Sequence, residues 1–313
     1  MLIFKLFDYN IDYMPPIANT FENICILRLS SIGDITHMIP VIKTIQHNLP
    51  KSNITWVIGK IEYSLVKDIK GIEFIVIDKK RTFSSIREMK SKLGSKKFDI
   101  LLHMQRSLRS KIISFFINAN KKFSYENVNM PSNIHVLDSF FYFLNKINIK
   151  EKILDWSLDY SLDNSISRFN LDFPEKKFLV INPFTSKRRS NWREWDFKNY
   201  LNISKYANDE YGLFTVFVGK NDTNIDIKNK YPYILNLVNK TNLQELSLVL
   251  NNCAFYIGPD SGTMHMASMH SKPIIGLFAT SNPKRTGPYN NQKYIVNKYD
   301  MALKNYIKTN EKN

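Results

Sequence analysis

The sequence predicts an α/β protein made of two doubly wound domains, and two observations carry this prediction. Short apolar runs alternate with segments of helical spacing, first over 23–165 and again over 166–313. Alternation of strand and helix favours a parallel sheet with helices on both faces. The chain of 313 residues is also longer than one typical domain. We therefore expect an extension at 1–22 followed by two similar domains.

The elements of both domains can be placed coarsely from apolar periodicity. Helical spacing appears over 42–49, 108–116, 195–207 and 243–250, and Thr241 with Gln244 predicts a capping box for the last helix. A polar stretch at 156–171 separates the domains. Two such units leave a cleft between them, and ligands bind beyond the carboxyl ends of parallel strands. The predicted strands are 24–29, 54–58, 74–77, 98–103, 178–181, 213–218, 234–238, 254–257 and 273–278.

The formal net charge of +16 predicts an anionic partner: a nucleic acid, a membrane surface or a phosphorylated substrate. A biased genome composition is the alternative explanation. From Lys60 to Lys122, however, 16 Lys and Arg stand against 6 Asp and Glu, which favours a directed basic surface. We expect neither a membrane span nor a signal peptide. Cys25 and Cys253 lie in apolar runs, so we expect no disulfide and a reducing cytoplasm.

The first candidate site follows the first predicted strand, in the segment 29–34 (LSSIGD). Its small residues let the backbone turn tightly and approach a ligand. Asp34 then lies at the carboxyl end of the strand, where a carboxylate can take a proton from a hydroxyl group and make it a nucleophile. The alternative is that Asp34 only caps the next helix. Pro40 lies too deep for a first-turn proline, so the helix kinks there or 34–39 forms its own turn.

The second candidate site is the segment 257–265 (IGPDSGTMH), which reads as strand, turn and helix start. The free amides of a helix N-terminus bind phosphate, and the hydroxyls of Ser261 and Thr263 add to them. His265 on the first turn can donate to a phosphate oxygen. The structural alternatives are a capping role for Asp260 and a buried imidazole for His265. Neither glycine turn matches a dinucleotide fingerprint or a Walker loop.

The third candidate site is the segment 182–192 (NPFTSKRRSNW), after the first strand of the second domain. Its hydroxyls and three cations can neutralise a diphosphate leaving group without a metal. The alternative is an ordinary solvated loop. The sequence has no paired His, no Cys-x-x-Cys and no Asp-x-Asp, so we predict no metal site.

Taken together, these motifs resemble those of glycosyltransferase family 9, the lipopolysaccharide heptosyltransferases. The segment 260–265 is similar to the family signature Asp-Thr/Ser-Gly-x-x-His, and 26–40 looks like the family's first strand–helix unit. The resemblance spans about 24–290 and includes 26–40 with His37 and Pro40, 99–109 with Gln105, 260–265, 277–283 and 285–289.

The resemblance implies a GT-B fold, in which two Rossmann-like domains face each other across a cleft. It implies inverting, metal-independent transfer of heptose from ADP-heptose to the inner core of lipopolysaccharide, with Asp34 as the catalytic base. Asp260 would contact the donor sugar, and the backbone near Thr241 the adenine. The donor-binding set is Ser31, Gly33, Thr185, Ser186, Lys187, Arg189, Asp222, Thr241, Asp260, Ser261, Gly262 and His265.

The chain departs from the family pattern at places that bear on the donor. Ser190 stands where the family usually has Lys, so Lys187, Arg188 or Arg189 has to supply the charge. Asp222 is the nearest candidate for the acidic ribose-binding residue. These departures leave open another nucleotide sugar, an epimerase of the same fold, or a family member that binds without catalysing. A nucleic-acid-binding protein is the rival from another class, but the chain has no recognisable signature for it.

The partners implied are therefore an ADP-sugar as co-substrate, with no cofactor, and an anionic acceptor built on lipid A and the core. We expect a peripheral monomer at the cytoplasmic face of the inner membrane, where each nearby Lys or Arg contributes about 1 kcal/mol. We expect no nucleic acid partner. The predicted acceptor-binding residues are Lys79, Lys80, Arg81, Gln105 and Arg109.

Overall fold

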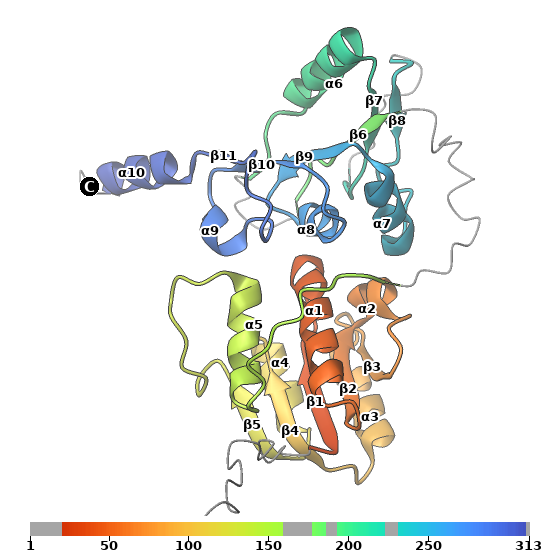
Figure 1. The fold of residues 1–313 in the computed structure, drawn as a ribbon, viewed down its shortest axis with the longest axis vertical. Coiled ribbons are helices and arrows are strands. Elements are labelled where there is room, and N and C mark those ends of the chain that lie inside the picture. The colour runs from red at the N-terminus through yellow and green to blue at the C-terminus, as the bar shows by residue number, and fades with distance from the viewer. Residues whose placement is uncertain (1–20, 159–176, 186–192, 223–230, 311–313) are drawn as a thin grey trace, which may run out of the picture.

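The computed structural model describes residues 21–158, 177–185, 193–222 and 231–310, with side chains up to Asn305 in the last helix. These residues form two parallel sheets, each flanked by helices (Figure 1). The predicted α/β class with two doubly wound sheets is confirmed. The predicted boundary between 165 and 166 lies outside the described residues, as does most of the extension at 1–22.

The N-terminal half forms a five-stranded sheet of order β3-β2-β1-β4-β5, in which every pairing is parallel. Its elements are β1 (Asn23–Leu27), α1 (Ile32–Asn48), β2 (Asn53–Gly59), α2 (Lys60–Val66), β3 (Ile72–Ile77), α3 (Thr82–Leu93), β4 (Phe98–His103), α4 (Leu108–Phe115), β5 (Ala119–Ser124) and α5 (Val136–Asn145).

The C-terminal half forms a six-stranded sheet of order β11-β10-β9-β6-β7-β8, again with parallel pairings. Its elements are β6 (Phe178–Ile181), α6 (Phe197–Tyr211), β7 (Phe214–Phe217), β8 (Ile234–Asn236), α7 (Leu243–Asn252), β9 (Phe255–Pro259), α8 (Gly262–Met269), β10 (Ile274–Phe278), α9 (Pro283–Thr286), β11 (Val296–Asn297) and α10 (Tyr299–Asn310).

Both faces of the first sheet are buried because successive side chains of a strand point to opposite faces. In β1, Ile24 and Ile26 join the cluster packed by α1 and α5, whereas Cys25 and Leu27 join the cluster packed by α3 and α4. The first of these clusters continues into the second domain through α7 and α8, and α1 contacts α8 directly. The two domains therefore share one apolar cluster, and α1, α2 and α5 face α7, α8 and α9 at their junction (Figure 1).

Two helix starts differ from the sequence prediction. The capping box of α7 is Asn242 with Glu245 rather than Thr241 with Gln244, and the Glu245 carboxylate accepts from the Asn242 amide at 2.8 Å. A carboxylate at this position also complements the positive end of the helix dipole, which a Gln amide does not. Helix α1 begins at Ile32 and continues through Pro40, so 34–39 does not form a separate turn.

The prediction missed elements with weak apolar patterns. The edge strand β5 has the sequence ANKKFS, and its Lys residues hide it from a hydrophobic count. The two-residue strand β11 was also not predicted. Helix α5 was missed too, although its sequence VLDSFFYFLN is strongly apolar. Cys25 and Cys253 are buried and unpaired, as expected. Among the described residues, none of the helices combines the length and apolar character that crossing a bilayer requires.

Candidate active site

Asp34 lies in the first turn of α1, at the carboxyl edge of the first sheet. Ser31 rather than Asp34 is the N-cap of the helix, but Asp34 is the N3 residue of its capping box, so the predicted capping role is present from that position. The Oδ2 atom of Asp34 accepts hydrogen bonds from the amide and the hydroxyl of Ser31, both at 2.8 Å. Among the described residues, its Oδ1 atom has no hydrogen-bond partner, and the side chain is 22% exposed. One oxygen is thus held in place while the other is left to accept a proton.

Arg28 completes the surroundings of Asp34 and was missed by the sequence prediction. Its Nη2 atom lies 2.5 Å from Oδ2 of Asp34, and its Nη1 atom donates to the carbonyl of Met104. The guanidinium is also 5.1 Å from the ring centroid of Phe140. Arg28 is therefore fixed on three sides and orients the carboxylate. Its signal in the sequence is a cation directly after a buried strand.

A hollow of about 750 Å³ opens in front of Asp34 and is lined from both domains. Gln105, a predicted acceptor residue, lines it, and its side-chain oxygen accepts from the amide of Leu29 at 2.7 Å. Because the cations outnumber the carboxylates, the hollow is suited to an anionic ligand. The lining cations are Arg28, Arg106 and Arg285, and the lining carboxylates are Asp34 and Glu126.

The second predicted motif forms the turn before α8. Ser261 is the N-cap of this helix, and its hydroxyl lies 3.3 Å from the side-chain amide nitrogen of Asn182. Within the described residues, no hydrogen-bond acceptor is found for the amides of Gly262 and Thr263. Two free amides at a helix start form a binding site for an anion.

Asp260 does not cap α8, so the capping alternative predicted for it is wrong. Its Oδ2 atom accepts a hydrogen bond from the hydroxyl of Thr286 at 3.0 Å, and its Oδ1 atom lies 3.7 Å from Nε2 of His265. Burial alone would raise the pKa of Asp260, but His265 and the Thr286 hydroxyl outweigh burial and lower it. The result is a fixed carboxylate beneath the turn.

The two turns meet at two glycines. A Cβ atom at Gly33 would lie 2.5 Å from Cδ2 of His265, and one at Gly262 would lie 2.9 Å from Cβ of Ile32. Neither position has room for a side chain, so glycine is what lets α1 and α8 touch. The expectation that a carboxylate turn and an amide turn lie side by side across the domain interface agrees with this geometry.

Three histidines gather at the same junction. The ring centroid of His37 lies 4.8 Å from that of His265 and 5.3 Å from that of His135. The Nε2 atom of His135 donates to the carbonyl of Gly287, 2.9 Å away, and so ties the start of α5 to the second domain. Burial, together with His265, His135 and Arg28, lowers the pKa of His37 well below its usual value. Among the described residues, no group of His, Cys, Asp and Glu is arranged to hold a metal ion.

The remaining donor-binding predictions fall after the carboxyl ends of β6, β7 and β8. The amide and hydroxyl of Thr185 donate to the carboxylate of Glu194, at 2.6 and 3.1 Å. Asp222 is exposed, and the adjacent Asn221 is hydrogen-bonded to Asn239, two residues before the predicted adenine position Thr241. The predicted residues Ser186, Lys187 and Arg189, together with Arg188 and Ser190, lie outside the described residues.

Four predicted acceptor residues lie away from the hollow of Asp34. Lys79 forms an ion pair with Glu62 at 2.7 Å, Arg81 precedes α3 as its N-cap residue, and Lys80 and Arg109 are exposed. None of the four is among the residues that line this hollow, although Lys79 to Arg81 follow the carboxyl end of β3. Their role in acceptor binding stays a prediction.

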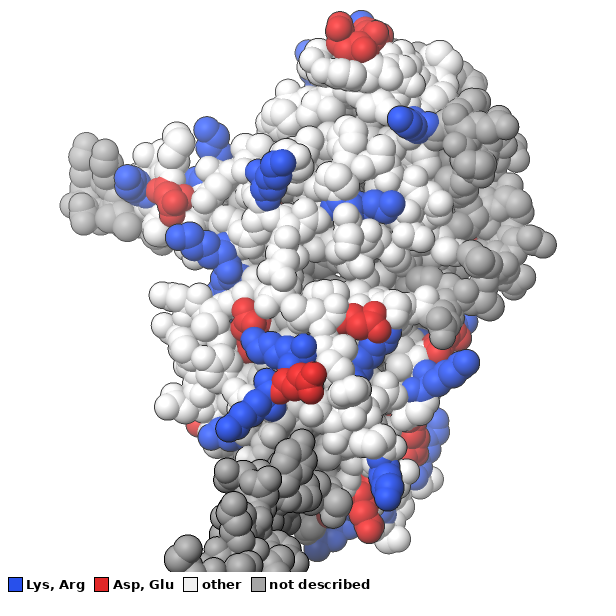
Figure 2. Space-filling view, in the orientation of Figure 1, with Lys and Arg blue, Asp and Glu red and all other residues white. Residues whose placement is uncertain are grey.

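The basic surplus is not gathered on the face that carries α1 and α5. In that view, blue and red side chains are interleaved over the lower domain (Figure 2). Ion pairs such as Lys43 with Asp155 at 2.7 Å, and Lys152 with Asp138 at 2.9 Å, account for part of this pattern. An anionic partner is therefore expected to bind at the hollow or at another face of the protein.

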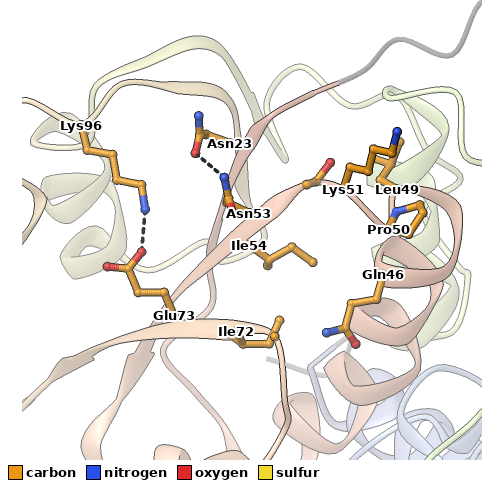
Figure 3. Close-up of a pocket in the computed structure, with 12 residues that line it drawn as sticks. Asn23, Gln46, Leu49, Pro50, Lys51, Asn53, Ile54, Ile72, Glu73 and Lys96 are labelled. Atoms are coloured by element: carbon orange, nitrogen blue, oxygen red, sulfur yellow. Dashed lines mark hydrogen bonds and ion pairs between the residues drawn. The ribbon is translucent and has the colours of Figure 1, made fainter.

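A second hollow, of about 660 Å³, lies at the amino edge of the first sheet (Figure 3). Asn23, Asn53 and Ile72, the first residues of β1, β2 and β3, line it. Across this hollow Lys96 forms an ion pair with Glu73 at 2.5 Å. Because ligands of parallel sheets bind at the carboxyl edge, where Asp34 lies, this hollow is not part of the candidate site.

Comparison with known proteins decides the family. The model described as glycosyltransferase family 9 (heptosyltransferase) matches residues 86–312, well over half of the chain. The chain belongs to glycosyltransferase family 9. It is 31% identical to the lipopolysaccharide core heptosyltransferase OpsX of Haemophilus influenzae, over 92% of this chain and 87% of that protein.

Solved structures support the fold of this family 9 glycosyltransferase. A family 9 glycosyl transferase from Veillonella parvula matches with a TM-score of 0.75 at 19% identity, covering 92% of this chain and 89% of that one. The E. coli heptosyltransferase WaaC, solved with ADP, matches with a TM-score of 0.71 at 15% identity, covering 92% and 99%. The GT-B fold expected from the sequence is confirmed.

Proposed function

We propose that this family 9 glycosyltransferase moves heptose from ADP-heptose to the inner core of lipopolysaccharide, with inversion and without a metal ion. The observation that carries the proposal is the meeting of the two turns. Asp34 faces the hollow, and the preceding Gly33 contacts His265 in the first turn of α8. A base and an anion-binding helix start thus lie on adjacent turns. The name of the Haemophilus influenzae relative, a lipopolysaccharide core heptosyltransferase, supports the same activity.

The proposed reaction is a single in-line displacement. The free carboxylate oxygen of Asp34 takes the proton of an acceptor hydroxyl, and the hydroxyl oxygen forms a bond to the anomeric carbon of heptose. The bond from that carbon to the diphosphate oxygen breaks, and ADP leaves with the electron pair. Negative charge then grows near the amides of Gly262 and Thr263. Removing one such preorganised donor typically lowers the rate about 10²- to 10³-fold.

We propose that the acceptor is anionic and lipid-linked. Arg106 and Arg285 line the hollow in front of Asp34, and guanidinium groups pair well with phosphates and carboxylates. The formal charge of +16 fits the same acceptor. On this basis the protein acts as a peripheral monomer at the cytoplasmic face of the inner membrane. Sedimentation of the purified chain tests the monomer.

Replacing the base tests the mechanism. Asp34→Asn keeps the shape of the side chain, and we expect it to lower kcat about 10²- to 10⁴-fold, the usual worth of a general base. Stabilisation of the protein by ADP should change little, because the diphosphate is proposed to bind at the amides of Gly262 and Thr263 and not at the Asp34 carboxylate. Asp155→Asn is the matched control, since it also removes an ion-paired carboxylate of the first domain. Near-normal turnover by Asp34→Asn would show that another group is the base.

The donor is tested by a thermal-shift panel of nucleotides and nucleotide sugars, because a ligand raises apparent stability by mass action. We expect ADP to stabilise the protein more than UDP or GDP does. Preference for another nucleotide would redirect the donor assignment. Conversion of the donor sugar without any acceptor would indicate an epimerase. Binding of the nucleotide sugar without any turnover would indicate a family member that does not catalyse.

A further inference from the structure

The outer surface of α3 and α4 carries large apolar side chains that nothing described in the structure covers. Phe83 is 88% exposed, Phe115 81% and Leu108 74%. Single exposed apolar residues are common, but here several occur on two helices of one side of the sheet, and the rings of Phe115 and Phe116 lie edge to face with centroids 5.5 Å apart. Such a group points to a partner. We call the group the α3–α4 face; its members are Phe83, Leu108, Ile112, Phe115 and Phe116.

Helix α4 carries an apolar stripe that faces solvent rather than the core. Leu108, Ile112 and Phe115 are spaced by four and three residues, so they form one stripe, and that stripe points to solvent. The opposite side buries Ser110 and Ile113 against the sheet. Packing within the domain therefore does not account for the apolar stripe, since the core uses the other side of the helix.

Helix α3 extends this surface. It packs on the same face of the sheet as α4, through Ile86, Met89 and Leu93. Its Lys90 ammonium lies 5.0 Å from the ring centroid of Phe116, at the end of α4, which links the two helices. The two helices thus lie next to each other on one side of the sheet, and both carry exposed apolar side chains.

The charges on this face select the partner. Together α3 and α4 contain five basic residues and one acidic residue, Glu88. Aromatic and aliphatic side chains flanked by Lys and Arg are typical of helices that lie in the interface of an anionic membrane. A second copy of the chain is less suited, because two such faces would bring like charges together. The basic residues are Arg87, Lys90, Lys92, Arg109 and Lys111.

We propose that the α3–α4 face docks onto an anionic lipid bilayer, with the exposed Phe and Leu side chains entering the headgroup boundary. Leu108 lies two residues after Arg106, which lines the hollow of Asp34. The docked face therefore leads to the mouth of the hollow. The use of this contact for catalysis rests on the proposed function; the contact itself does not.

Vesicle cosedimentation tests the contact. We expect the full chain to bind vesicles of phosphatidylglycerol and phosphatidylethanolamine, and to bind phosphatidylcholine vesicles far less. Phe83→Ser with Phe115→Ser should weaken binding to the anionic vesicles about 10- to 100-fold. Arg87→Gln with Lys90→Gln should reduce both the binding and its dependence on salt. Tyr206→Ser with Tyr211→Ser, which removes two exposed aromatics of α6 in the other domain, is the matched control.

The outcomes separate this proposal from the proposed function. Phe83 and Phe115 are exposed, so their double variant should keep the melting temperature and the transfer rate onto a lipid-free acceptor fragment, and lose rate only on vesicle-embedded acceptor. Equal vesicle binding by the variant and the parent overturns the docking face. A dimer of the parent that the variant loses also overturns it, in favour of self-association. Inactivity of the parent on both acceptors bears on the proposed function alone.

Discussion

The contact between Gly33 and His265 makes the junction of the two domains testable with one methyl group. A Cβ atom at position 33 would lie 2.5 Å from Cδ2 and 3.3 Å from Cγ and Nε2 of the imidazole. The imidazole is buried and cannot swing away into solvent. Gly33→Ala therefore has to push α1 and α8 apart or force His265 from its position.

The expected loss of stability follows from two opposing effects. Overpacking a filled interior costs about 1–3 kcal/mol of unfolding free energy. Replacing Gly by Ala inside a helix returns at most about 1 kcal/mol, and less in the first turn, where Gly33 lies. We expect a net loss of about 1–2 kcal/mol. A shift of about 1 Å at this junction would also displace Asp34 and lower kcat about 100-fold.

Urea unfolding of a double-mutant cycle measures this prediction. In a His265→Ala background the space opposite position 33 is empty, so Gly33→Ala should cost nothing there or stabilise slightly. The cycle should give a coupling of about 1–3 kcal/mol between the two sites. Equal effects of Gly33→Ala in both backgrounds would refute the contact, and with it the argument that the two turns abut.

Two further predictions concern the surroundings of Asp34. Arg28→Met removes the cation that orients Asp34. We expect kcat to fall about 10- to 100-fold, with little change in the KM of the donor. Lys43→Met removes another ion pair of this domain and should leave kcat unchanged. Because the pKa of His37 is lowered in the folded protein, its stabilising effect is complete above the unfolded value of 6.5 and is lost as the pH falls below it. His37→Leu should therefore reduce the slope of unfolding free energy against pH between 6.5 and 5 by up to about 1.4 kcal/mol per pH unit. His47→Leu, at an exposed position of the same helix, is the control variant.

Each of these two predictions has a result that would contradict it. A kcat unaffected by Arg28→Met would mean that Ser31 alone positions the carboxylate. An unchanged slope in His37→Leu would mean that His37 takes up a proton as readily in the folded chain as in the unfolded one. The urea midpoints of the His37→Leu and His47→Leu variants, measured at several pH values, check the prediction about His37.

Sequence reasoning placed the buried strands well because strands covered on both faces are continuous apolar runs. The strands β4 and β6 were predicted to the residue, since every second side chain enters each of two cores. The edge strand β5 was missed because it buries little and carries two exposed Lys side chains. A strand is recognised in the sequence by the apolar side chains that it buries, and an edge strand buries few of them.

The candidate site was likewise predicted only where its residues are neighbours in the sequence. The motifs around Asp34 and Asp260 are local, because each is a turn after a strand, and turn chemistry is written in adjacent residues. Arg28 was missed since its partner is chosen by the path of the backbone after β1 rather than by composition. Only the structure showed that Ser31 and Ser261 are the N-cap residues, with Asp34 as the capping-box partner of Ser31 and Asp260 outside the cap.

What the sequence determined by itself is the alternation of strands and helices, the two-domain α/β architecture and the family resemblance, because periodicity and short motifs are properties of neighbouring residues. What only the tertiary structure decided is which distant residues meet. His37 lies in α1, His265 in α8 and His135 at the N-cap of α5, and the rings of His135 and His265 reach that of His37 only because these elements dock together. That docking depends on the absence of a side chain at Gly33 and Gly262, a fact of space that no local pattern records.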